Sequence, residues 1–308
     1  MKYLATAAQA SVAVLYPVCR WLSGRDRAPF DVMNAALRPD HVVGGKTDAL
    51  LASLRVGRDI GLLDRSGGTR TTDQEADWAL HEQARSQRDE WYANPARFRI
   101  LARRALLAKA VDDIAAGETP SDVAVGLAWL LAQDPVRPLA RGYGDGPEKQ
   151  QPENLLNSQN MRPYITGPDQ WRPFLRWAAA LGCAEYSQVG NRRLILPDPT
   201  AALAEELPLI PRAGVSARAF YAAVTQELPV LDGGQISDFM REKRGEFADS
   251  RGDAMVGPAF SLALRRLQGR GVIDLHREAD AAYRVNGVLH GQRWTFDRVT
   301  RRSENGDV

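Results

Sequence analysis

Residues 257–285, GPAFSLALRRLQGRGVIDLHREADAAYRV, decide the fold that the sequence predicts. The apolar residues of 258–268 recur at helical spacing and are followed by Gly269 and Gly271, which predicts a helix that ends there. Two short apolar runs, 272–275 and 282–285, flank a polar turn and are typical of paired strands. A helix followed by such a hairpin is the second half of a winged helix, a helix-turn-helix domain with a β-hairpin wing.

The same order of a helix, a glycine-containing apolar junction and a turn occurs twice more in the chain. The two further junctions are IGLLD at 60–64 and LGCAE at 181–185. Each is followed by turn-forming residues and a second apolar or β-branched run, so each predicts a hairpin. The predicted hairpins pair 62–65 with 69–72 and 183–188 with 192–196.

The predicted fold class is therefore mainly α with small β-hairpins, built from tandem winged-helix-like units and a helical insert. Residues 73–135 show no strand pattern, and the helix expected at 123–133 is apolar nearly all round, which is typical of a buried helix. The predicted parts are winged-helix-like unit 1 at 1–72, the helical insert at 73–135, winged-helix-like unit 2 at 136–210 and winged-helix-like unit 3 at 211–308.

The composition is that of an ordinary folded protein. The chain has 308 residues, of which 44% are apolar and 25% are charged, and its formal net charge is +2. This length holds two or three domains. Because the net charge is small, any nucleic-acid site must come from local clustering of cations.

The sequence predicts a cytoplasmic location. Cys19 and Cys183 lie in apolar settings far apart, which favours buried free thiols in a reducing compartment. The apolar run near the N-terminus has the spacing of a first core helix and lacks the layout of a signal peptide. No run approaches the ~18 apolar residues of a membrane span, so we expect no membrane contact.

A winged helix binds DNA through its third helix, which requires a face with hydrogen-bond donors and without carboxylates. Unit 1 is a poor candidate because Asp48 and Asp59 lie on that face. In unit 3 the apolar residues turn inward and leave Ser261 and three donor side chains outside. The candidate DNA-binding residues are Arg265, Arg266, Gln268, Arg277 and Arg284 in unit 3, and Arg172, Arg176, Arg192 and Arg193 in unit 2. Two alternatives stay open, since exposed arginines also serve solvation and winged helices also serve as protein-interaction modules.

The evidence for a nucleotide, a metal or a catalytic group is weak. Residues 44–47, GGKT, end like a phosphate-binding P-loop, but Asp40 stands where its first glycine belongs, and Thr47 is explained as a helix cap. The histidines have no partner at ligand spacing; they are His41, His81, His276 and His290. We therefore predict no cofactor, no metal site and no catalytic residue. An enzyme would need a cluster of carboxylates or histidines that forms only in three dimensions.

Four segments are similar to one known family. They are DVAVGLAWLLAQDP at 122–135, FLRWAAALGCAE at 174–185, LPDPTAA at 196–202 and LPVLDGG at 228–234. In these segments the chain resembles the DpdG family, which is encoded in bacterial gene clusters that insert 7-deazaguanine derivatives into DNA and restrict unmodified DNA. None of the segments is a catalytic motif. The resemblance implies a component of a phage-defence or DNA-modification system that works beside enzymes encoded next to it.

The predicted function is a non-catalytic DNA-binding or adaptor subunit of a DNA-modification and phage-restriction system. Its expected partners are double-stranded DNA and other subunits of the complex. The alternative is a protein-interaction scaffold that docks partner subunits without direct DNA contact. The acids of unit 1 and the mixed charges of 73–92 favour this alternative.

Overall fold

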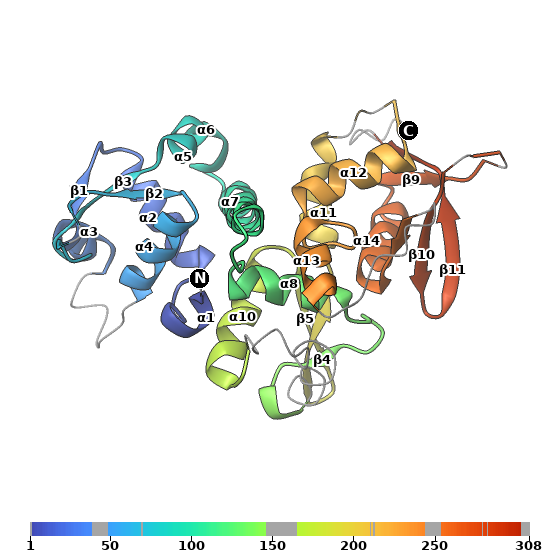
Figure 1. Cartoon of the computed structure of the whole chain (residues 1–308), viewed down its shortest axis with the longest axis horizontal. Coiled ribbons are helices and arrows are strands. Elements are labelled where there is room, and N and C mark those ends of the chain that lie inside the picture. Colours follow the sequence, from blue (N-terminus) through green and yellow to red (C-terminus); the bar gives the residue numbers. More distant parts are fainter. Residues whose placement is uncertain are drawn as a thin grey trace.

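The structure is a computed structural model of the whole chain. It describes residues 2–38, 49–68, 70–145, 165–209, 211, 213–243, 254–278, 280–281 and 283–302. The P-loop-like residues 44–47 and His41 lie outside the described residues. Figure 1 shows an N-terminal part on one side of the long helix α7 (Pro95–Ala115), and the C-terminal helices and strands on the other.

The N-terminal part packs helices against a small sheet. Its elements are α1 (Tyr3–Thr6), α2 (Val12–Leu22), β1 (Ala28–Pro29), α3 (Phe30–Leu37), α4 (Ala49–Asp59), β2 (Leu63–Arg65) and β3 (Asp77–Leu80). The predicted pairing of 62–65 with 69–72 is wrong, because β2 pairs with β3 and places Leu63 opposite Leu80. In β3 Trp78, Ala79 and Leu80 are all buried, so the strand lacks the alternation that reveals a strand in sequence.

The middle of the chain is helical and leads into a second sheet. Its elements are α5 (Glu82–Ser86), α6 (Arg88–Trp91), α7, α8 (Asp122–Ala132), β4 (Leu139–Ala140), the 3-10 turn η1 (Tyr143–Asp145), α10 (Pro168–Ala180), β5 (Ala184–Val189), β6 (Arg192–Pro197), α11 (Thr200–Glu206) and η2 (Leu207–Leu209). Nearly every residue of α8 is buried, as predicted. The predicted hairpin of 183–188 with 192–196 is confirmed as β5 and β6, and β4 extends it in the order β4-β6-β5.

The C-terminal part contains two further sheets. Its elements are β7 (Val215–Ser216), α12 (Ala217–Glu227), α13 (Gln235–Lys243), β8 (Ala254–Val256), α14 (Pro258–Gly269), β9 (Ile273–His276), β10 (Val285–Leu289), β11 (Gln292–Phe296) and β12 (Arg298–Arg301). The predicted wing of 272–275 with 282–285 is wrong, because β9 pairs with β12. β10 instead forms a hairpin with β11 and runs parallel to β8. The tight turn is made by His290 and Gly291, both at positive φ, as a two-residue hairpin turn requires.

These pairings correct the predicted fold class. Helices make up 51% of the structure and strands 18%, and the strands of the described residues form four three-stranded sheets rather than isolated wings. The mainly α class with winged-helix units therefore does not describe the chain. Each of the four sheets includes a strand that lies far along the sequence from its partner, which local patterns do not reveal. The division into four parts stays a prediction. Among the described residues, no helix is both long and apolar enough to cross a membrane.

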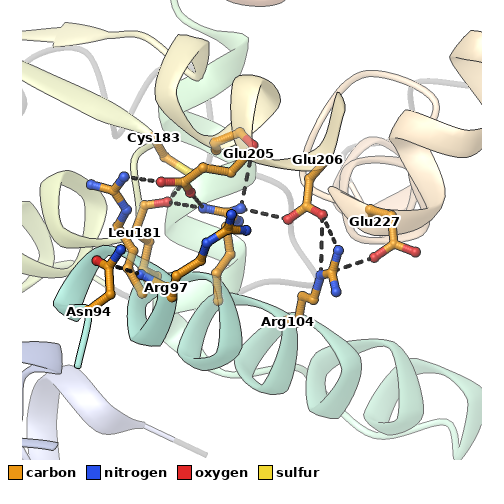
Figure 2. A network of polar contacts seen from close by, with 11 residues as sticks. Asn94, Arg97, Arg104, Leu181, Cys183, Glu205, Glu206 and Glu227 are labelled. Carbon is orange, nitrogen blue, oxygen red and sulfur yellow. Dashed lines mark hydrogen bonds and ion pairs between the residues drawn. The ribbon is translucent and has the colours of Figure 1, made fainter. Parts of the chain in front are cut away.

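A buried ion network joins α7 to the C-terminal part. The Arg103 side chain is fully buried and donates to Glu205 and Glu206 at 2.6 Å each. It also reaches the carbonyl oxygen of Leu181 at 3.1 Å. Arg104 bridges Glu206 at 2.5 Å and Glu227 of α12 at 3.4 Å (Figure 2). Because a buried guanidinium is stable only with partners, α7, α11 and α12 are held in one arrangement.

This network gives a stability prediction. Glu206→Gln leaves the buried Arg103 with one carboxylate, so we expect the free energy of unfolding to fall by about 3 kcal/mol. Urea denaturation measures it. The matched control is Glu242→Gln, which makes the same change at an exposed position on α13 and is expected to alter stability little. Equal losses in the two variants would contradict the role of the network.

A buried carboxylate, that of Asp122, binds the backbone of α1 near the N-terminus. Asp122 lies at the start of α8, is 1% exposed and accepts a hydrogen bond from the backbone N–H of Leu4 at 2.9 Å. Burial raises the pKa of Asp122 to about 6, and the backbone N–H donors only partly oppose this rise.

The shift predicts a pH dependence with a definite sign. Between about pH 4 and pH 6 the folded chain keeps a proton on Asp122 that the unfolded chain has released, so the free energy of unfolding falls as the pH rises. In Asp122→Asn this titration is absent. Urea denaturation at several pH values should show the variant gaining about 2 kcal/mol relative to the wild type across this range. A difference that does not change with pH would contradict the assignment.

Candidate nucleic-acid interface

The helix predicted to read DNA, α14, is packed into the structure. It contacts α8, α11, β9 and β10. Ser261, which was expected on the outer face, is fully buried. Its hydroxyl donates to the carbonyl oxygen of Val256 at 3.4 Å and accepts from the N–H of Val288 at 3.0 Å. The helix therefore keeps only a narrow outward strip, on which Arg265 and Gly269 are exposed and Leu262 is half-buried.

The two arginines of α14 are engaged within the chain. Arg266 forms ion pairs with Glu185 on β5, at 2.7 Å, and with the buried Asp198 that precedes α11. The guanidinium of Arg265 lies 4.5 Å from the centre of the Trp294 ring and donates to Gln268 at 2.9 Å. Arg265 stays exposed, whereas Arg266 holds α14 against the β5–β6 hairpin.

This placement predicts that Arg266 acts on stability. Arg266→Ala leaves the buried carboxylate of Asp198 without its charged partner, so we expect the free energy of unfolding to fall by about 1–3 kcal/mol. Arg270→Ala is the matched control, since Arg270 is exposed one turn further along the chain. Denaturant unfolding compares the two variants. If Arg270→Ala is as destabilised as Arg266→Ala, the ion pair has no structural role.

The remaining candidates of the third unit lie among mixed charges. Arg277 is exposed beside the exposed Glu278, and Asp280 is exposed nearby. Arg284 is half-buried and reaches the carbonyl oxygen of Glu278 at 3.5 Å. Carboxylates at these positions oppose the approach of phosphate.

The candidates of the second unit lie on the surface formed by α10 and the β5–β6 hairpin, on both faces of the hairpin. Arg172 and Arg176 are exposed one turn apart on α10, and Arg192 and Arg193 are exposed at the start of β6. In the register of the hairpin, Arg193 lies on the same face as Tyr186, and Arg192 lies on the opposite face.

Two residues that the sequence analysis missed belong to the same surface. Arg141 follows β4, and its backbone N–H donates to the carbonyl oxygen of Arg193 at 2.9 Å. Its guanidinium lies 4.8 Å from the centre of the Tyr186 ring. Burial raises the pKa of Tyr186, and the nearby Arg141 and Arg176 oppose that rise. Arg141 follows a loop rich in proline and glycine, so nothing local in the sequence marks it.

We call this cluster the β5–β6 basic surface. It consists of Arg141, Arg176 and Arg193 near Tyr186, of Arg172 one turn before Arg176 on α10, and of Arg192 on the opposite face of the hairpin. In the described part of the chain, none of these five arginines forms an ion pair. Arg176 is instead positioned by the carbonyl oxygen of Ala8 at 2.7 Å. The surface therefore offers guanidinium groups whose charge no described carboxylate neutralises.

The carboxylates most suggestive of catalysis are used to hold the fold. Glu205 and Glu206 bind arginines of α7, and Asp198 binds Arg266 and the backbone N–H of Thr200. Among the residues that the structure describes, no group of three or more His, Cys, Asp or Glu side chains is arranged to hold a metal ion. The surface brings together cations and one aromatic ring.

Comparison with known proteins supplies the biological context. The family model described as DpdG-like matches residues 1–281. The chain belongs to the DpdG-like family. No curated protein and no solved structure matches it. Membership confirms the resemblance noted in the sequence and points to a role in a 7-deazaguanine DNA-modification system, whose multi-gene clusters imply partner proteins.

One of the segments that carry the family resemblance, LPVLDGG at 228–234, joins α12 to α13. In LPVLDGG the carbonyl oxygen of Pro229 accepts from the N–H groups of Ile236 and Ser237 at 3.0 and 3.1 Å. The Asp232 carboxylate accepts from the N–H of Gly257 at 2.7 Å, just before α14. A Cβ atom at Gly234 would lie 2.5 Å from the Pro229 carbonyl oxygen, so glycine is required there. In this segment the resemblance therefore follows the architecture and marks no chemical site.

Proposed function

We propose that this chain is a non-catalytic subunit that contacts double-stranded DNA within a 7-deazaguanine DNA-modification and phage-restriction system. The contact is made through the β5–β6 basic surface. The observation that carries the proposal is the set of exposed arginines without described ion pairs, gathered from β4, α10 and β6. Family membership supports the DNA context.

Guanidinium groups suit phosphate because they donate two parallel hydrogen bonds and stay charged at all relevant pH values. Two of the arginines are also held in place before any ligand binds. Arg141 is held by the Tyr186 ring, and Arg176 by the Ala8 carbonyl oxygen. Such preorganisation lowers the entropy that binding costs.

The proposed contact is to the DNA backbone. The arginines lie on a hairpin and on the side of a helix, and the packed α14 is not free to enter the major groove. Contacts to phosphate position a protein on the duplex without reading its sequence. The binding should therefore depend strongly on salt and weakly on base sequence.

The experiment is a salt titration of DNA binding. The double variant Arg172→Ala/Arg192→Ala should bind duplex DNA more weakly, and its plot of log affinity against log salt should be shallower by about 0.9 for each phosphate that the variant no longer neutralises. Fluorescence anisotropy with a labelled duplex measures both quantities. The control Arg97→Ala/Arg270→Ala removes the same charge from exposed positions elsewhere and should leave the slope unchanged. Equal effects in both double variants would exclude a localised contact.

A second function, docking of partner subunits, is favoured by the segment between β3 and α7. Glu82, Asp89 and Glu90 are exposed beside the half-buried Arg85 and Arg88, and a surface with both signs of charge suits a specific protein contact. Co-purification with the other products of the gene cluster tests it. Recovery of this chain alone, under conditions that keep it folded, would count against docking.

A further inference from the structure

Among the described residues, no strand pairs with the outer edge of β5. This strand is the last in the order β4-β6-β5, and residues 185–189 are all exposed. Val189 pairs with Arg192 across a two-residue turn, so alternate residues of β5 turn their backbone groups toward β6. The N–H of Asp198 donates to the carbonyl oxygen of Cys183 at 3.2 Å, which places the odd-numbered residues in that inward set. The N–H and C=O groups of Ala184, Tyr186 and Gln188 therefore point outward.

In the part of the chain that the structure describes, this edge has few of the devices that protect exposed strands. Proteins block strand edges with proline, charged side chains, bulges or covering segments. The one charged side chain of β5, Glu185, is bound by Arg266 of α14. The sequence of β5, AEYSQV, contains neither proline nor lysine, and its pairing with β6 runs through six residues without a bulge. Tyr186 and Val189 are 43% and 64% exposed and lie on opposite faces of the strand. A sheet edge of this kind, with an exposed apolar group on each face, is typical of a site where an extended segment adds to the sheet as a further strand.

The charges around the edge of β5 indicate which side chains an added strand would carry. The Arg141 side chain starts beyond β6 and still reaches the Tyr186 ring, so an arginine on this surface extends as far as β5. Arg193 lies on the same face, and Arg192 lies on the other. A strand added beside β5 would therefore meet Arg141 and Arg193 on the Tyr186 face, whereas the other face carries Glu185, paired with Arg266, as well as Arg192. Carboxylate side chains would be favoured on the Tyr186 face, where a second copy of this chain would bring the same arginines and be repelled.

We propose that the outer edge of β5 binds an extended, acidic segment of another protein by strand addition. The proposal goes beyond the DNA contact because it uses backbone N–H and C=O groups, whereas DNA binding uses the guanidinium groups. Both contacts share the hairpin, so an acidic segment bound at β5 would reduce the charge available to DNA.

The test uses a synthetic peptide in which Glu alternates with Val, added to the full-length chain. Amide hydrogen exchange, followed by NMR, should be fast at Tyr186 and Gln188 in the free protein, because these amides point to solvent. The peptide should slow exchange at both. At Ser187, whose amide already bonds β6, exchange should change little. A peptide in which Lys replaces Glu should bind roughly tenfold more weakly or less well still.

A proline variant separates the strand edge from the DNA surface. Gln188→Pro removes one outward N–H and leaves the pairing with β6 intact, so it should weaken peptide binding roughly tenfold. Gln188→Ala keeps the N–H and should bind as the wild type does. Neither change removes a cation, so duplex DNA should bind both variants equally. If the proline variant does not fold, the exchange pattern of the wild type and of Gln188→Ala decides.

Three results would overturn the proposal. One is unchanged exchange at Tyr186 and Gln188 when the acidic peptide is added. Another is equal slowing by the Lys peptide or by duplex DNA, which would assign the strand to the DNA surface. A third is slow exchange of both amides in the free protein together with a dimeric mass, which would assign the edge to a second copy. Loss of DNA binding in Arg172→Ala/Arg192→Ala bears on the proposed function alone.

Discussion

The fully buried guanidinium of Arg103 is the constraint on which the arrangement of the chain depends. It lies on α7, between the N-terminal part and the C-terminal helices, and is bound by Glu205 and Glu206 and by two backbone carbonyl oxygens. Removing such a charge from water costs several kcal/mol unless its partners are in place. The network therefore fixes the position of α7 relative to α11, because only one placement of the two helices brings both carboxylates to the guanidinium.

The position of α11 in turn fixes the position of the proposed DNA surface. Asp198 accepts a hydrogen bond from the N–H of Thr200 at the start of α11 and binds Arg266 of α14, which also binds Glu185 on β5. These contacts of α14 with β5 and with the start of α11 fix the orientation of the β5–β6 hairpin. The same contacts engage Arg266, which the helical pattern alone marks as an exposed donor. The arginines outside this contact are Arg192 at the start of β6, Arg141 and Arg193 on the opposite face of the hairpin, and those of α10.

The sequence predicted the helices well and the strand pairings poorly. Helical periodicity is local, so α8 and α14 lie where the pattern placed them. The hairpin of β5 and β6 was also found, because its strands are joined by a two-residue turn. β2 pairs with β3 beyond an intervening loop, and β9 pairs with β12 beyond the whole β10–β11 hairpin, so neither strand pairs with the next apolar run as a local pattern predicts. The winged-helix interpretation failed for this reason.

The candidate site shows the same limit. The sequence could predict the exposure of four arginines, Arg172, Arg176, Arg192 and Arg193. It could not predict that Asp198 neutralises Arg266 or that Arg141 stacks on the Tyr186 ring, because both depend on tertiary contacts.

Chemical-shift mapping of the wild-type chain with duplex DNA tests most directly whether the β5–β6 basic surface contacts DNA. The account predicts that shifts gather at Arg141, on α10 and along the β5–β6 hairpin. Shifts that gather instead at Arg265, Arg277 and Arg284, or no shifts at all, would contradict it.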